Sequence, residues 1–188
     1  MKNQFICLLV LFVVVAIAKG QSGDQGIILN PNDFVNKKIS FQKRQGLKYK
    51  MHVFEGSPHR KLSIILGDSL FHFSKDSIFG YVDRHHDFYR IYNQTIFKIL
   101  NPNETLLIYA REYLGGYKNT QTLIEYYFSR KPGAPIHKLN LHQLKLVFSD
   151  LQNFREQLDL AFDSDADLLE FDKGKQKYKI NELNINAE

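Results

Sequence analysis

The chain has 188 residues, 44% of them hydrophobic and 13% aromatic, and a formal net charge of +5. This composition excludes a disordered or collagen-like protein, and the length suits one domain behind a short leader. Basic residues cluster only weakly, at residues 37–44 and 60–61, without interleaved aromatic side chains. We therefore expect no binding to nucleic acid.

The N-terminus has the organisation of a secretory leader. Residues 5–18 form an unbroken apolar run that follows Lys2 and ends in the small residues A-I-A. The run is too short for a permanent membrane anchor, so the pattern predicts a cleaved signal peptide over residues 1–20 and no membrane span afterwards. Cys7, the only cysteine, lies near the start of the run, which predicts neither a lipoprotein anchor nor a disulfide. A secreted or periplasmic location is expected, and a disulfide-free domain favours a bacterial envelope.

After the leader, residues 21–38 are expected to be a flexible lead-in, and residues 39–188 a single α+β domain. Its first part, 39–139, is rich in apolar runs and apolar–polar alternation separated by turn residues, which is typical of consecutive antiparallel strands. The expected strands are 39–41, 47–53, 61–66, 70–73, 77–82, 88–92, 96–100, 106–109, 109–113 and 122–129. The segment K-P-G-A-P at 131–135 interrupts this pattern.

The period then changes to that of helices. Asn140 is expected to cap a helix through Phe148, and Asp150 to cap a second one. A third helix is expected from a capping box formed by Ser164 and Asp167. The helical part spans 140–174 and a short tail spans 175–188. Strands followed by helices indicate an α+β fold, with an antiparallel β-meander or open barrel-like sheet covered by the C-terminal helices.

One turn concentrates the potentially reactive side chains. The sequence D-R-H-H-D separates two expected strands, and aromatic residues follow it. Tyrosine-rich strands beside a polar turn can bind sugars, peptides or proteins. The candidate binding residues are Asp83, His85, His86, Asp87, Tyr89 and Tyr92.

The same turn allows a second hypothesis, a metal-dependent or acid–base hydrolase that uses His85, His86 or Asp87. Adjacent histidines on a strand point to opposite faces, so a shared metal would need a further ligand, for which His52, His59 and His72 are available. No metal site, catalytic residue or cofactor is predicted. The pair Glu112 and Glu125 has a spacing suited to glycoside hydrolysis but is interpreted as surface charge. Asn93 and Asn103 begin N-glycosylation sequons.

Several longer segments resemble a known group of proteins. These are G-Y-V-D-R-H-H-D-F-Y-R-I-Y-N-Q-T-I-F-K-I-L-N-P-N-E-T-L-L-I-Y from residue 80, the stretch 124–148, F-R-E-Q-L-D-L-A-F-D-S-D-A-D-L-L-E-F-D from residue 154, and Y-K-I-N-E-L from residue 178. Together they resemble small secreted proteins of Bacteroidetes-type bacteria over about residues 77–183. The resemblance implies a location and a domain outline, without a function or site residues.

The sequence therefore favours a secreted or periplasmic non-enzymatic module, a binding or envelope-associated protein with a protein or glycan partner. The hydrolase is the alternative from another class, and a purely structural envelope protein is the third hypothesis.

Overall fold

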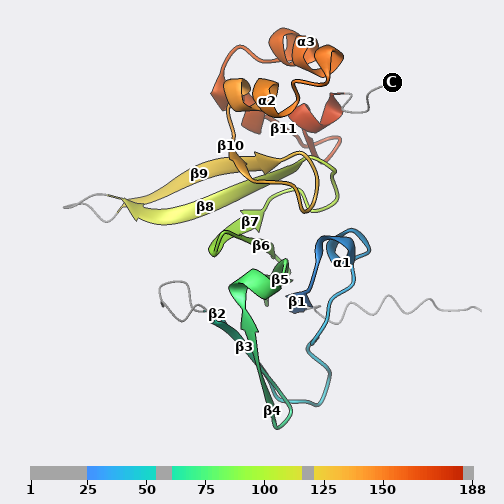
Figure 1. Ribbon diagram of the computed structural model, residues 1–188, viewed down its shortest axis with the longest axis vertical. Coiled ribbons are helices and arrows are strands. Elements are labelled where there is room, and N and C mark those ends of the chain that lie inside the picture. Colours follow the sequence, from blue (N-terminus) through green and yellow to red (C-terminus); the bar gives the residue numbers. More distant parts are fainter. Residues whose placement is uncertain (1–24, 54–60, 116–120, 184–188) are drawn as a thin grey trace, which may run out of the picture.

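The structure is a computed structural model that describes residues 25–53, 61–115 and 121–183. The expected signal peptide and His59 lie outside these residues. The α+β class predicted from the sequence is confirmed, because antiparallel sheets come first and the larger helices follow them (Figure 1).

The main sheet is an open antiparallel meander, with β1 and β10 at its edges in the described part of the chain. It has seven strands in the order β1-β5-β6-β7-β8-β9-β10. Their bounds are β1 Gly26–Ile28, β5 Gly80–Val82, β6 Phe88–Tyr92, β7 Thr95–Ile99, β8 Leu107–Gly115, β9 Gln121–Ser129 and β10 His137–Lys138. The bounds of β6 are those predicted from the sequence, whereas the runs 106–109 and 109–113 belong to one strand, β8.

A second sheet is formed by β2 (Tyr49–Val53), β3 (Lys61–Leu66) and β4 (Ser69–Ser74), in that order. Its inner face carries the alternating apolar residues of the sequence, including Met51 and Ile64, which pair across the two strands. Together with Tyr81 and Ile91 of the main sheet, Ile64 belongs to one buried cluster. The two sheets are therefore joined by a hydrophobic contact near β5 and β6.

The C-terminal part covers the other end of the main sheet (Figure 1). Phe148 and Phe154 pack against Ile108 of β8 and Phe128 of β9 in one buried cluster. The elements are α2 Leu141–Val147, α3 Gln152–Ala161, the 3-10 helices η2 Asp165–Leu169 and η3 Lys179–Glu182, and the hairpin β11 Phe171–Asp172 with β12 Lys177–Tyr178.

Two of the three helix starts follow the sequence signals. The side chain of Asn140 accepts the N–H of Gln143, as expected of an N-cap, and the capping box of Ser164 and Asp167 is present. The expected cap at Asp150 is wrong. Leu151 occupies the N-cap position of α3, while the carboxylate of Asp150 accepts two hydrogen bonds of 2.8 Å from the guanidinium of Arg130. The third helix ends at Leu169, before the predicted stop.

The expectation that residues 21–38 form a flexible lead-in is wrong for the part that the structure describes, because residues 25–38 contain a strand and a helix. Ile27 and Ile28 in β1 are 0% and 1% exposed, and a short helix, α1 (Pro31–Val35), follows. The side chain of Asn30 caps α1 by accepting the N–H of Asp33. A three-residue strand and a five-residue helix are too short for periodicity to show in the sequence. Residues 39–41 form a single bridge, Ser40 to Ile27, instead of a strand. Of the expected strand 77–82, Ser77 is the last residue of a 3-10 helix, η1 (Lys75–Ser77), and only residues 80–82 form a strand, β5.

The strand register defines two faces of the main sheet, because residues paired across strands point the same way. One face carries Tyr89, Lys98 and Ala110, which are neighbours across β6, β7 and β8; we call it the recess face. The opposite face carries Arg90 and Tyr109; we call it the arginine face.

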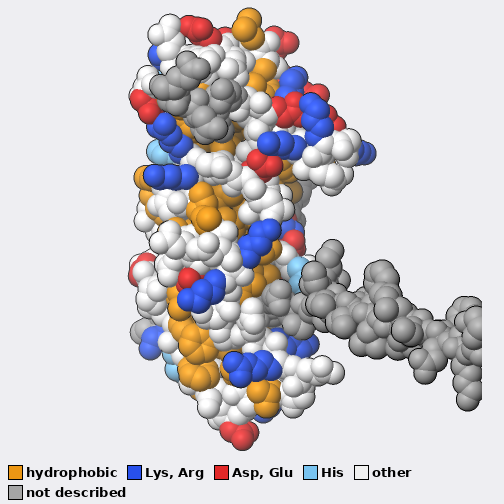
Figure 2. Space-filling model, turned by 90° about the vertical axis from the view of Figure 1, so that its right-hand side faces the viewer, with side chains coloured by type: hydrophobic (Ala, Val, Ile, Leu, Met, Phe, Trp, Pro, Cys, Tyr) orange, Lys and Arg blue, Asp and Glu red, His pale blue; other side chains and the backbone are white. Residues whose placement is uncertain are grey.

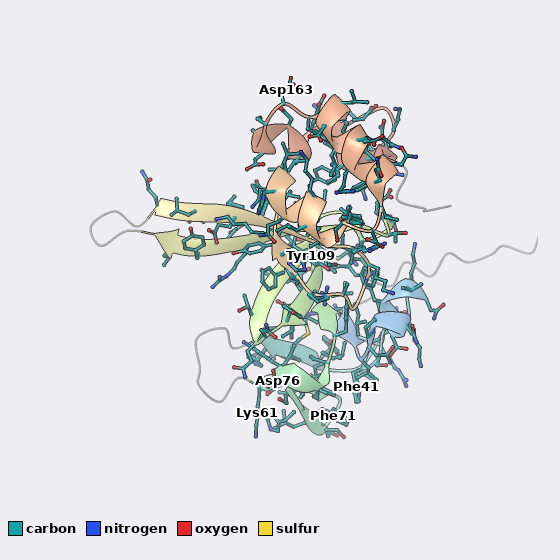
Figure 3. All side chains as sticks on the ribbon, turned by 45° about the horizontal axis from the view of Figure 1, so that its top comes forward. Phe41, Lys61, Phe71, Asp76, Tyr109 and Asp163 are labelled. Atoms are coloured by element: carbon teal, nitrogen blue, oxygen red, sulfur yellow. The ribbon has the colours of Figure 1, made fainter. Side chains whose placement is uncertain are left out.

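Arg90 is a buried cation at the centre of the arginine face, with 3% of its surface exposed. Its Nη1 donates to the Tyr109 hydroxyl at 2.9 Å and to Ser129 Oγ at 3.3 Å, and its Nη2 donates to the Ala134 carbonyl at 2.6 Å. Three aromatic rings lie within 6 Å of the guanidinium carbon: Phe79, Tyr92 and Tyr109. Arg90 therefore ties β6 to β8, to β9 and to the loop after β9. Tyr109 lies near the middle of the molecule (Figure 3).

Candidate functional site

A cavity of about 460 Å³ opens on the recess face over β6, β7 and β8. Tyr89, Lys98 and Glu112 line it from the three strands, and Gln94 lines it from the turn between β6 and β7. Lys75 of η1 lines the side towards the second sheet. Pockets of this size hold small ligands in proteins. The cavity thus brings cationic, anionic, amide and phenolic groups together.

Tyr89 is held in place by a ring stack. Its ring lies parallel to that of Tyr81, with centroids 4.8 Å apart and an interplanar angle of 9°. Tyr81 is only 5% exposed and belongs to the cluster between the two sheets. The phenol of Tyr89 therefore enters the cavity from a rigid support.

Lys98 connects the cavity to the turn that the sequence singled out. Its Nζ lies 2.7 Å from Asp87 Oδ2, and the two side chains are 38% and 36% exposed. An ion pair this exposed contributes little to stability, so its importance lies in the position of the two charges. Asp87 directly precedes β6, and its contact with Lys98 places its carboxylate on the side of the recess face.

The turn itself is shaped by Asp83. One carboxylate oxygen, Oδ1, accepts the backbone N–H groups of His85 at 2.8 Å and Asp87 at 3.0 Å. His86 takes a left-handed backbone conformation, with φ of 64°. Both imidazoles are exposed, and His85 Nε2 accepts a hydrogen bond from the Arg84 side chain at 3.0 Å. Asp83 is thus a positioning residue, while His85 and His86 form the outer rim of the turn.

The structure brings five of the six candidate residues into one neighbourhood and separates the sixth. Asp83, His85, His86 and Asp87 share the turn, and Asp87 leads to Tyr89 in the cavity. Tyr92 points to the arginine face, where its ring lies 5.2 Å from the Arg90 guanidinium carbon. Its role is in packing around Arg90.

The sequence analysis missed Lys75, Gln94 and Lys98, and it interpreted Glu112, which lines the cavity, as surface charge. Lys98 had a partial signal, because it is the single charged residue of its strand and must point opposite to Phe97 and Ile99; Arg90 of β6 shows the same pattern but is buried. Lys75 had none, since its position depends on packing between η1 and the main sheet.

The acidic and histidine side chains of the two sheets bear on the hydrolase hypothesis. Within residues 25–53, 61–115 and 121–183, no group of three or more His, Cys, Asp or Glu side chains is placed to hold a metal ion. Glu112 is opposite Ile124, whereas Glu125 is opposite Arg111, so the two carboxylates point to different faces of the hairpin. Hydrogen bonds from the Tyr127 hydroxyl and Lys138 lower the pKa of Glu125, which favours a constant negative charge over proton transfer.

A serine–histidine contact occurs elsewhere, on the second sheet. Ser63 Oγ lies 2.8 Å from His72 Nδ1. The strands β2, β3 and β4 contain no Asp or Glu, so none of them supplies the acid of a catalytic triad. The contact is a cross-strand hydrogen bond. The sequon residues Asn93 and Asn103 are both exposed.

No family model, curated protein or solved structure matches this chain. Among the described residues, no helix is both long and apolar enough to cross a membrane.

Proposed function

We propose that this chain is an exported, non-enzymatic binding module whose cavity on the recess face holds an acidic glycan. The observation that carries the proposal is the meeting of Tyr89, Lys98 and Glu112 in one cavity, next to the ordered Asp83–Asp87 turn. The apolar run of residues 5–18 behind Lys2, which predicts a secretory leader over residues 1–20, supports export.

The ligand class follows from the polar groups. Sugar hydroxyls both donate and accept hydrogen bonds. The cavity offers the Glu112 carboxylate as an acceptor, the Gln94 amide as both donor and acceptor, and lysine ammonium groups as donors. A sugar carboxylate matches Lys98, which already holds a carboxylate at 2.7 Å. The phenol of Tyr89 adds an aromatic surface with a polar tip, a combination suited to amphipathic ligands.

Titration of purified protein with a panel of neutral and uronic-acid oligosaccharides, followed by NMR chemical shifts and calorimetry, tests the proposal. We expect uronic-acid oligosaccharides to shift the amide resonances of β6, β7 and β8. Lys98→Met should weaken this binding at least about ten-fold, the loss of one charge-assisted hydrogen bond.

Lys138→Met is the matched control, because Lys138 also forms a strand ion pair, 3.1 Å from Glu125, but does not line the cavity. Equal binding by the Lys98 and Lys138 variants, or no response to any oligosaccharide, would contradict the proposal. Stoichiometric zinc that disappears on replacing His85 and His86 would favour the hydrolase instead. Mass spectrometry of protein recovered from the periplasm or medium tests export, with loss of the leader expected.

A further inference from the structure

The outer face of the second sheet combines cations with exposed aliphatic side chains. Across β2, β3 and β4, the register aligns Lys50, Ile65 and Leu70 in one row and His52, Ser63 and His72 in the next. Lys61 and Ser74 form a third row. The opposite face of the sheet is the one buried against the main sheet, so these rows face away from it.

The charge of this face is of one sign. The three strands contain no Asp or Glu, and residues 34–53 contain six lysines and arginines and no acid. Lys43 and Arg44 are exposed in the segment leading into β2, and Phe41 of that segment packs against Phe71 of β4, with ring centroids 4.9 Å apart (Figure 3). Because Phe71 points to the inner face of the sheet, this packing places the segment on the inner side, so Lys43 and Arg44 do not belong to the outer rows. The nearest acids in sequence are Glu55, two residues after β2, Asp68, in the β3–β4 turn, and Asp76, two residues after the end of β4.

Exposed aliphatic side chains distinguish this face from an ordinary basic surface. Leu70 is 58% exposed on the edge strand β4, and Ile65, its neighbour in the same row, is partly exposed. Figure 2 shows hydrophobic and basic side chains side by side at the lower end of the molecule, where Figure 1 places the second sheet. Aliphatic groups surrounded by lysines match the boundary between acyl chains and anionic headgroups.

We propose that the outer face of the second sheet docks on a bilayer surface that carries anionic lipid headgroups. Lys50 and Lys61 contact the headgroups, and Leu70 enters the boundary with the acyl chains. Binding of nucleic-acid bases or sugars by stacking would require aromatic side chains on the outer face. The aromatic side chains of β4, Phe71 and Phe73, point to the inner face instead. This inference does not depend on the ligand of the recess-face cavity, and it would keep an exported module at the envelope.

Co-sedimentation with vesicles tests the proposal. The probes are phosphatidylcholine vesicles with and without phosphatidylglycerol, at low and high salt. We expect binding only to vesicles that contain phosphatidylglycerol, and release at high salt. The double variant Lys50→Glu/Lys61→Glu should bind at least about 25-fold more weakly, since each lysine near an anionic surface is worth about five-fold. Leu70→Ser should bind several-fold more weakly with an unchanged salt dependence.

The matched control is Lys131→Glu/Lys173→Glu, which makes the same charge change at two exposed lysines outside the second sheet. Circular dichroism and thermal unfolding of each variant establish that it is folded. Equal vesicle binding by the two double variants would overturn the proposal. So would heparin binding without vesicle binding, which would assign the face to a polysaccharide, or no binding to either vesicle.

Discussion

Replacing Arg90 with methionine tests whether a buried guanidinium stabilises this fold. Methionine retains most of the apolar stem but removes the donors to Tyr109, Ser129 and Ala134. Hydrogen bonds from a charged donor are each worth about 1.5–3 kcal/mol, and the Ala134 carbonyl would lose its partner at a further cost of about 1–3 kcal/mol. Removing the cation also relieves a desolvation penalty of several kcal/mol.

The balance predicts that Arg90→Met lowers the free energy of unfolding by about 3 kcal/mol. The stabilising side prevails because both terminal nitrogens have acceptors and three rings surround the cation, although Nε has no partner in the described structure. Urea unfolding followed by circular dichroism measures the change, and limited proteolysis should show earlier cleavage in residues 130–136, which lose their tie to β6.

Arg84→Met is the control, because Arg84 is exposed and its side chain forms an exposed hydrogen bond to the adjacent His85 at 3.0 Å. Its unfolding free energy should change by less than about 0.5 kcal/mol. A double-mutant cycle with Tyr109→Phe should give a coupling energy of at least about 1 kcal/mol. An Arg90→Met protein as stable as the wild type would refute the reasoning, since it would show that desolvation outweighs the hydrogen bonds.

Three further predictions concern stability, measured by urea unfolding. Burial raises the pKa of Tyr49 to about 12, and its hydroxyl has no partner among the described residues. The unfolded chain ionises first, so the contribution of Tyr49 to stability should be constant below about pH 10 and fall from there towards pH 12. Tyr49→Phe should remove that part of the fall and raise the free energy of unfolding at pH 7 by about 1 kcal/mol. A variant whose stability falls above about pH 10 as steeply as that of the wild type would contradict this. Asn140→Ala should lower the free energy of unfolding by about 1 kcal/mol, because α2 loses its N-cap. Asp150→Ala should lower it by less than about 1 kcal/mol, because only a surface ion pair is lost. A larger loss for Asp150→Ala than for Asn140→Ala would support the cap at Asp150 that the sequence predicted. Asn101→Ala should cost about 3 kcal/mol, because Asn101 is buried and bonds to the Leu106 carbonyl, to the N–H of Ile108 in β8 and to Asn181. A loss under about 1 kcal/mol would show that water replaces those bonds.

Where the sequence carried a repeated local pattern, it predicted structure well. The bounds of β6 coincide with its aromatic run, and Asn140 caps α2 as its position indicates. Short elements escaped detection. β1 pairs with β5, which lies more than 50 residues further along the chain, and nothing within three residues specifies that partner.

The candidate site shows the same division. The sequence located the polar Asp83–Asp87 turn and predicted that neighbouring residues on a strand point to opposite faces. It did not indicate which face of β6 would be open. Tyr92 looked equivalent to Tyr89 as a binding residue, yet it packs beside Arg90.

By itself, then, the sequence determined the order of the larger strands and helices, the turn positions and two helix caps, because these depend on residues within a few positions of one another. Tertiary structure alone decided that Asp87 meets Lys98, that Arg90 is buried, and that the basic rows of the second sheet face outward. Those outcomes depend on which surfaces pack together, and that choice is made by apolar burial summed over the whole chain.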